Sequence, residues 1–355
     1  MNNDRIQEIL DLMEEARLDY FLISDPQSIA YCTGYYNDPH ERMFVFMVSK
    51  HGNHTLFMND LFYLEHDLDV SIVWHKDGQD AIQTIVDEMH FPGRIGIDKN
   101  WASHFLLDLM KKLPDAKYIN ASPCVDLVRM KKDLQEQVLM IESSKINDAV
   151  MEEIIPFIQE GVTEKQLAKK LDELFFNHHS TCYGAIVAFG KNAADPHHEN
   201  DDTPLRKGDC VLIDMGCVYK GYCSDMTRTF FYEGILEEEI KVYEIVKKAN
   251  EAAEAMIKPG VKLSDIDKCA RKVISDEGYG KYFTHRLGHF IGRDVHEYGD
   301  VSSVNEMEVE EGMIFSIEPG IYLEGNFGVR VEDLVMVTKD GCQVLNSFTK
   351  DIYII

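Results

Sequence analysis

Residues 211–230 carry two acidic side chains inside otherwise apolar, β-rich runs, and no other stretch constrains the fold so strongly. Asp214 interrupts the first run and Asp225 opens the second, with a short turn at Lys220 and Gly221 between the runs. This pattern predicts a β-hairpin. A lone carboxylate in an apolar strand is costly unless it is paired or bound to a cation. Two such carboxylates close together therefore point to a bound metal.

Composition and charge exclude several classes of protein. The 355 residues carry a formal net charge of −26, which argues against binding to nucleic acid or to an anionic membrane. No apolar run approaches the roughly 20 residues of a membrane span, and the polar N-terminus lacks the apolar region of a secretory signal. The eight cysteines form no CxxC pair, which is typical of reduced thiols. We expect a cytoplasmic protein.

The N-terminal part of the sequence alternates helical and strand patterns. Apolar residues at helical spacing predict a helix over 4–18. Strands are then expected at 20–24, 43–49, 54–58, 70–75, 94–97 and 117–120, and helices at 80–90 and 102–113. This alternation predicts an α/β domain with a mostly covered sheet, which we place at residues 1–125.

The pattern changes near 124–130, and residues 126–355 are predicted to form a second domain. A long helix is expected from 133 to 158, and Thr163 is the expected N-cap of a helix that begins at 164. The other expected elements are strands at 184–189, 314–317 and 329–337 and helices at 236–257 and 264–277.

Three further segments of the second domain place ionisable residues in apolar surroundings. His289 lies in a glycine-flanked segment, Glu318 ends an apolar run, and Glu332 lies inside a strand pattern. Together with Asp214 and Asp225 they form an oxygen-rich ligand set, which suits Mn²⁺, with Co²⁺ or Zn²⁺ as alternatives. Four acids exceed what one divalent ion needs, so some are expected to bridge two ions about 3.5–4 Å apart and to generate a hydroxide nucleophile. For any single buried acid, a hydrogen-bonded structural role is the alternative.

The order and spacing of these five residues resemble the pita-bread metallopeptidase family (M24). That family includes Xaa-Pro dipeptidases (prolidases), Xaa-Pro aminopeptidases and methionine aminopeptidase. The resemblance covers essentially the whole C-terminal half, and the N-terminal domain resembles that of the Xaa-Pro branch and of creatinase. It implies a creatinase/prolidase-like α/β domain at 1–125 and an α+β pita-bread catalytic domain at 126–355.

The resemblance also implies which residues hold the metal ions. Asp214 would bind one ion, and His289 and Glu318 would bind the other. Asp225 and Glu332 would bridge both. Two divalent ions per subunit are therefore expected, with Mn²⁺ favoured.

Further residues are implied to act on the substrate. His296 would contact the substrate and the developing tetrahedral intermediate, His197 would bind substrate, and His285 matches a third active-site histidine. By environment, either Glu318 or Glu332 could pass the proton to the leaving imino nitrogen, and the resemblance favours Glu318. His198 has no such match and is expected to be structural or exposed.

Several residues bear on specificity. Arg286 stands where the family usually has a small residue, and Phe290 where it has glycine. Arg293 is our candidate for the residue that receives the C-terminal carboxylate of a dipeptide, with a solvent-facing arginine as the alternative. Arg330 is a further candidate for substrate binding.

The loop Asp38–Arg42 resembles a loop in prolidases of lactic-acid-type bacteria, in which the N-terminal domain of one subunit helps to close the site of its dimer partner. His40 and Arg42 are therefore candidates for substrate binding, and a homodimer is expected. A solvated turn is the alternative for this charged loop.

The predicted function is metal-dependent hydrolysis of the Xaa-Pro bond, with dipeptides as the favoured substrates. The expected partner is a small peptide with proline at its second position. One alternative is an Xaa-Pro aminopeptidase that acts on longer peptides. Another is a non-catalytic pita-bread binding module, although such modules typically lose ligands. A creatinase-like amidinohydrolase works without metal and lacks this ligand set.

Overall fold

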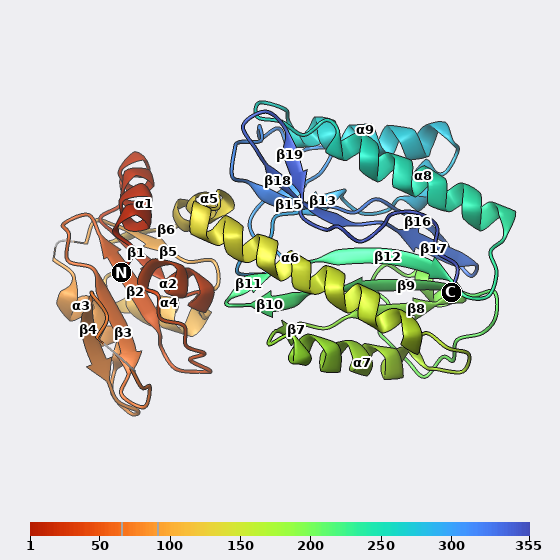
Figure 1. Ribbon diagram of the computed structural model, residues 1–355. Coiled ribbons are helices and arrows are strands. Elements are labelled where there is room, and N and C mark those ends of the chain that lie inside the picture. Colours follow the sequence, from red (N-terminus) through yellow and green to blue (C-terminus); the bar gives the residue numbers. More distant parts are fainter. Residues whose placement is uncertain (65–66, 91) are drawn as a thin grey trace. The chain divides into compact units, whose positions relative to one another are not determined.

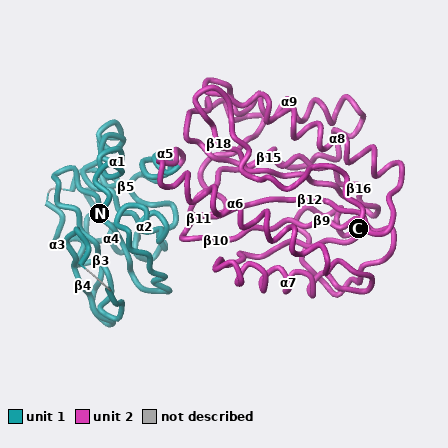
Figure 2. The backbone as a smooth tube through the Cα atoms, in the orientation of Figure 1, with its two compact units in different colours: residues 1–129 teal, residues 130–355 magenta. Residues whose placement is uncertain are grey.

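The computed structural model describes residues 1–64, 67–90 and 92–355, which form two compact units, residues 1–129 and 130–355 (Figure 2). The boundary predicted between 125 and 126 falls inside helix α5 (Pro123–Met130). All eight cysteines are free thiols. In the described part of the chain, no helix is long and apolar enough to cross a membrane.

The first unit is an α/β domain built on one six-stranded sheet, as predicted. Its strands are β1 (Tyr20–Ile23), β2 (Val45–Ser49), β3 (Thr55–Asn59), β4 (Ser71–His75), β5 (Arg94–Ile97) and β6 (Lys117–Asn120). Its helices are α1 (Asn3–Glu15), α2 (Pro26–Thr33), α3 (Ala81–Glu88), α4 (Ser103–Lys112) and all of α5 except its last residue, Met130. The strand order is β4-β3-β2-β1-β5-β6 (Figure 1).

Both faces of this sheet are covered. Phe21 and Ile23 on β1 point into one core, which also contains residues of α1 and α2. Tyr20 and Leu22 point into the opposite core, with residues of α3 and α4. The period of two along a strand explains this alternation, and burial on both faces explains the nearly continuous apolar runs in the sequence.

The second unit is assembled from small antiparallel sheets. Its helices are α6 (Leu134–Ile154), α7 (Glu164–Asn177), α8 (Glu237–Glu254) and α9 (Leu263–Asp276), with 3₁₀ helices η1 (Ile155–Phe157), η2 (Gly190–Ala194) and η3 (Gly280–Tyr282). Its strands are β7 (Thr181–Cys182), β8 (Ile186–Phe189), β9 (Cys210–Met215), β10 (Cys217–Tyr219), β11 (Tyr222–Cys223), β12 (Met226–Phe231), β13 (Gly288–His289), β14 (Asp300–Val301), β15 (Ile314–Ile317), β16 (Gly320–Leu323), β17 (Phe327–Arg330), β18 (Asp333–Val337) and β19 (Cys342–Val344). In Figure 1, α8 and α9 lie along one side of these strands, α7 lies along the opposite side, and α6 crosses in front of them.

Local capping fixes where two of these helices begin. Thr163 caps α7 in a reciprocal capping box with Gln166, which confirms the predicted N-cap. Asp133 and Glu136 form the same arrangement at the start of α6.

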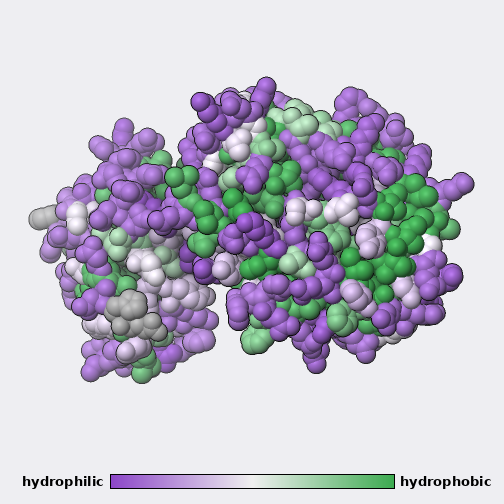
Figure 3. All heavy atoms as spheres, viewed as in Figure 1, coloured by the Kyte–Doolittle hydropathy of each residue, from purple (hydrophilic) through white to green (hydrophobic). Residues whose placement is uncertain are grey.

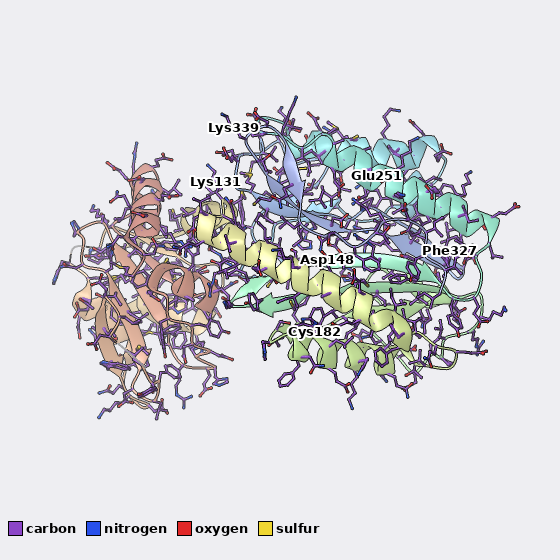
Figure 4. The ribbon with its side chains drawn as sticks, in the orientation of Figure 1. Lys131, Asp148, Cys182, Glu251, Phe327 and Lys339 are labelled. Atoms are coloured by element: carbon purple, nitrogen blue, oxygen red, sulfur yellow. The ribbon has the colours of Figure 1, made fainter. Side chains whose placement is uncertain are left out.

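Farther along α6, the carboxylate of Asp148 (labelled in Figure 4) accepts hydrogen bonds from the C-terminal segment, including one of 2.8 Å from the Ser347 amide.

The predicted hairpin is confirmed. Strands β9 and β12 pair antiparallel with Asp214 opposite Thr227. Lys220 and Gly221 both have positive φ, 49° and 82°, as a tight hairpin turn requires. The stem is interrupted at Gly216, where a Cβ atom would lie 2.0 Å from a backbone carbonyl oxygen, so this close approach needs glycine. The strands beyond this point, β10 and β11, form the tip.

Hydrophilic side chains cover much of the face of each unit that Figure 3 shows.

Candidate metal centre

The ends of several strands of the second unit bring the five predicted ligand residues into one pocket of about 390 Å³. Asp214 lies on β9, Asp225 immediately precedes β12, and His289 ends β13. The pairing of β15 with β18 sets Ile317 opposite Asp333, so Glu318 and Glu332, the next residues beyond this pair, lie at the same end of the ribbon.

The buried part of the pocket has the spacing of a cation site. Asp225, His289 and Glu332 each offer a ligand atom, and these atoms lie within 4.8 Å of one another. The Nε2 atom of His289 is 3.6 Å from Asp225 Oδ2 and 3.5 Å from Glu318 Oε1. The Thr227 hydroxyl donates a 2.7 Å hydrogen bond to Glu332 Oε2 and so orients that carboxylate. One oxygen each of Asp225 and Glu318 is thus close to the same imidazole nitrogen.

Burial and mutual repulsion make this group of acids unfavourable without a cation. Burial raises the pKa of Asp225 and of Glu332 well above their ordinary values, and neighbouring carboxylates raise both further. Burial likewise raises the pKa of Glu318 to about 7. Burial, together with nearby His296, lowers the pKa of His289 to about 3, which leaves its ring neutral and able to bind a metal. The donor set and its electrostatics therefore fit divalent cations.

Asp214 has a different environment from the other acids. Arg330, which is 2% exposed, donates a 2.6 Å hydrogen bond from Nη2 to Asp214 Oδ2. Its Nε atom donates to Thr227 and its Nη1 atom to the Tyr322 hydroxyl. Burial opposes the charge of Arg330, but Tyr322, Asp214 and other nearby acids raise its pKa well above the ordinary value. The structure thus brings Arg330 to the pocket, where it holds one of the acids.

The three predicted histidines also line the pocket. The His296 ring centroid is 4.1 Å from that of His289. His285 is fixed by contacts of both ring nitrogens, including 2.9 Å from Nε2 to the Tyr322 hydroxyl, and burial lowers its pKa to about 4. The backbone amide of His197 donates to Asp195, and its side chain is exposed.

Of the remaining specificity candidates, one arginine lines the pocket and the others do not. Arg286, which we noted only as a departure from the family pattern, lines the pocket. Arg293 is not among the lining residues, and its guanidinium lies 5.4 Å from the centroid of the Tyr222 ring. Arg42, in the first unit, forms a bidentate ion pair with Asp77, with Nε 3.0 Å from Oδ1 and Nη2 2.9 Å from Oδ2. His40 is exposed and has a positive φ of 52°. The substrate-binding roles of Arg293, His40 and Arg42 stay predictions.

Sequence reasoning missed two tyrosines of this site. Tyr183 lines the pocket, and its hydroxyl donates a 2.8 Å hydrogen bond to the Ser224 carbonyl. It also lowers the pKa of Asp225, against the larger opposite effect of burial. Tyr322 joins His285 to Arg330. Burial raises the pKa of Tyr183 well above its ordinary value and that of Tyr322 to about 12, so both keep their protons. Neither tyrosine lies in a motif that a single sequence reveals.

Comparisons with known proteins point in one direction. The model of metallopeptidase family M24 matches residues 138–339, and the creatinase/prolidase N-terminal domain matches residues 5–131. An uncharacterized peptidase of Staphylococcus aureus is 34% identical over 355 residues, covering 98% of this chain and 99% of that protein. A dipeptidase structure from Pyrococcus horikoshii has a TM-score of 0.92 and 35% identity, over 99% of this chain and 100% of its own. A prolidase structure from Thermococcus sibiricus has a TM-score of 0.94 and 32% identity, over 100% of this chain and 99% of its own.

Proposed function

Because the chain belongs to metallopeptidase family M24 and has the creatinase/prolidase domain before its catalytic domain, we propose that it hydrolyses Xaa-Pro dipeptides. Members of this family bind divalent metal ions. The observation that carries the proposal is the gathering of four carboxylates and His289 in one pocket, with Asp225, His289 and Glu332 buried. Two of the similar structures are a dipeptidase and a prolidase, which supports dipeptides over longer peptides.

In this proposal the five ligand residues hold two ions, with Mn²⁺ favoured by the oxygen-rich donors. Asp214 would hold one ion, His289 and Glu318 would hold the other, and Asp225 and Glu332 would help to hold both. When bound, such ions polarise the scissile carbonyl and make a bound water acidic.

The other pocket residues orient the substrate and move protons. Glu318, which lines the pocket with one carboxylate oxygen 3.5 Å from His289 Nε2, passes a proton to the leaving proline nitrogen in this proposal. Burial keeps His296 neutral by lowering its pKa, so it acts as a hydrogen-bond donor to the developing oxyanion. His197 binds substrate from the exposed rim of the pocket, and Arg330 holds Asp214 in place.

A substrate panel tests the proposal. Xaa-Pro dipeptides and Xaa-Pro-Yaa tripeptides are assayed with Mn²⁺, Co²⁺ or Zn²⁺ and after metal removal by a chelator. We expect metal-dependent cleavage with the dipeptides preferred. Preference for the tripeptides would make the protein an Xaa-Pro aminopeptidase. No cleavage, with no tightly bound or activating divalent ion, would leave the non-catalytic binding module.

Metal binding is expected to release protons and to tighten as the pH rises through about 7. Burial raises the pKa of Glu318 from 4.5 to about 7 and raises that of Asp225 and of Glu332, so these acids carry protons that a cation must displace. Calorimetric titration of the chelator-treated protein with Mn²⁺, in buffers of different ionisation enthalpy, measures the proton count. An affinity that is constant from pH 6 to pH 8, with no proton released, would contradict this prediction.

Two arginines are candidates for binding the carboxylate of the dipeptide. Arg286 lines the pocket, is exposed, and forms no ion pair with any acid that the structure describes. The guanidinium of Arg293 lies over an aromatic ring. We expect Arg286→Gln to raise KM for an Xaa-Pro dipeptide about 10-fold or more, because a charge-assisted hydrogen bond contributes about 1.5–3 kcal/mol. KM for Xaa-Pro-Yaa, whose carboxylate lies one residue farther along, should change little.

Arg293→Ser is the matched variant in this experiment. A selective loss on dipeptides in Arg293→Ser rather than in Arg286→Gln would assign the clamp to Arg293. Equal losses on dipeptide and tripeptide in both variants would exclude both arginines as carboxylate receptors.

A further inference from the structure

We propose that Glu164 is a positioning residue for His197, a role that rests on the proposed function because His197 acts on the substrate there. The His197 ring lines the pocket but makes no hydrogen bond to another described residue, and it is exposed. Its place in the pocket therefore depends on the backbone that carries it. That backbone runs from the end of β8 through η2 to Asp201.

Glu164 holds this backbone on both sides of His197. It is the first residue of α7, and its side chain is fully buried. Its Oε1 atom accepts hydrogen bonds of 2.9 Å from the Phe189 amide and from the Asn192 side chain, which precede His197. Its Oε2 atom accepts from His198 Nε2 at 2.6 Å and from the Asp201 amide at 3.0 Å, which follow it. An ionised carboxylate can only accept, so the His198 ring nitrogen is the donor.

We call the four hydrogen bonds that Glu164 accepts the anchor, and neighbouring contacts make it rigid. The side chain of Asn200 accepts a 2.7 Å hydrogen bond from the Val187 amide and donates one of 2.7 Å to the Ala185 carbonyl. These two bonds hold the end of the segment that carries His197 against β8. Asp195 accepts from the His197 amide at 3.0 Å. With its neighbours tied in this way, His197 has little backbone freedom. His198, expected to be structural or exposed, is half-buried and contacts Glu164.

Glu164, His198 and Asp201 also lie close enough together to hold a cation. The hydrogen bonds argue for the anchor instead. Each oxygen of Glu164 already has two N–H donors, and two of the four are backbone amides. A cation would have to displace these buried or half-buried donors, of which the Asn192 amide also donates to the Thr203 hydroxyl at 3.2 Å.

Glu164→Gln tests the proposal with little change in shape. The glutamine oxygen can still accept from Phe189 and Asn192, but its amide group then faces the His198 and Asp201 donors. We expect kcat/KM for an Xaa-Pro dipeptide to fall about 10- to 100-fold, the cost of a displaced substrate-binding group. The Mn²⁺ content and affinity should not change. Glu239→Gln is the matched control, because Glu239 is a buried acid that caps α8 and does not line the pocket.

A double variant separates positioning from a general effect on the fold. If Glu164 acts through His197, then Glu164→Gln combined with His197→Ala should be no less active than His197→Ala alone. Losses that multiply would overturn the proposal. His198→Gln, whose amide can still donate to Glu164, should keep more activity than His198→Ala. Equal losses in these two variants would also count against the anchor.

A measurement without turnover separates this inference from the proposed function. Failure of the wild-type protein to cleave any Xaa-Pro dipeptide would overturn the proposed function only. The anchor is then judged from hydrogen exchange of the Phe189 and Asp201 amides and from the NMR signals of the His197 ring. We expect Asp201 to exchange at least about 10-fold faster in Glu164→Gln and the ring signals to shift or broaden. Unchanged exchange and unchanged ring signals would overturn the anchor.

Discussion

Asp225→Asn is expected to reduce kcat/KM by about 10³-fold or more and to remove bound metal, because this residue is proposed to hold both ions. An amide nitrogen in place of one carboxylate oxygen cannot bind a cation. Asp214→Asn should be less damaging, since Asp214 is proposed to bind one ion and already shares its charge with Arg330. Steady-state kinetics on an Xaa-Pro dipeptide and metal analysis of each purified variant measure the difference.

The same substitution should stabilise the metal-free protein. Burial and the nearby charges of Asp214 and Glu318 raise the pKa of Asp225 well above 3.8. Because the folded-state pKa is raised, the stabilising contribution of the protonated acid is full below the unfolded value and is lost as the pH rises through the folded value. At neutral pH the wild-type protein therefore bears the free-energy cost of burying an ionisable acid at position 225. The neutral amide of the Asp225→Asn variant removes that cost, so thermal unfolding in the presence of a chelator should occur at a higher temperature than for the wild type.

The pair of results is diagnostic. A variant that is more stable without metal, yet inactive and unable to bind metal, indicates an acid that serves cation binding at the expense of stability. Asp225→Asn that keeps its metal and its activity would contradict the proposed bridging role. A loss of activity accompanied by lower stability without metal would indicate a structural role instead.

The hairpin and the five ligand candidates were predictable because their signal is local. An acid inside an apolar run is conspicuous wherever it occurs, and the turn at Lys220 and Gly221 is short enough to recognise. The order of the acids along the chain then matched a known family, and the comparisons confirm that family. The α/β character of the first unit was predictable for a similar reason, because strand and helix periods differ.

Features that depend on partners distant in the sequence were not predictable. The run 329–337 reads as one strand, but β17 pairs with β16 and β18 pairs with β15, and Glu332 lies at the break between them. Helix α2 was missed because its residues from Ser28 to Thr33 are all buried, which removes the helical alternation of apolar and polar positions. The sequence also could not separate Arg286, which lines the pocket, from Arg293, which does not.

Arg228→Met is expected to lower the free energy of unfolding by about 3–5 kcal/mol, because it removes one partner of a buried ion pair. The Arg228 side chain is 1% exposed, and its Nη2 atom lies 2.7 Å from Asp333 Oδ1. Nitrogens of the same guanidinium donate to the backbone carbonyls of Thr227, Glu332, Phe348 and Thr349. One side chain thus ties β12, the segment at Glu332 and the C-terminal segment together, so its loss leaves several buried acceptors unsatisfied.

A second basic side chain, Lys350, also contacts Asp333 and limits the loss of stability. Lys350 Nζ lies 2.7 Å from Asp333 Oδ2. Burial alone would raise the pKa of Asp333, but Arg228 and Lys350 hold it below the ordinary value, so the acid stays charged at neutral pH. Arg228→Met leaves that charge with Lys350 only, whereas Arg228→Met/Asp333→Leu removes both buried charges. The double variant should therefore lose less stability than the sum of the single losses, as urea unfolding of the metal-free proteins can measure. Additive losses, or a loss below about 1 kcal/mol in Arg228→Met, would mean that the pair contributes little beyond packing.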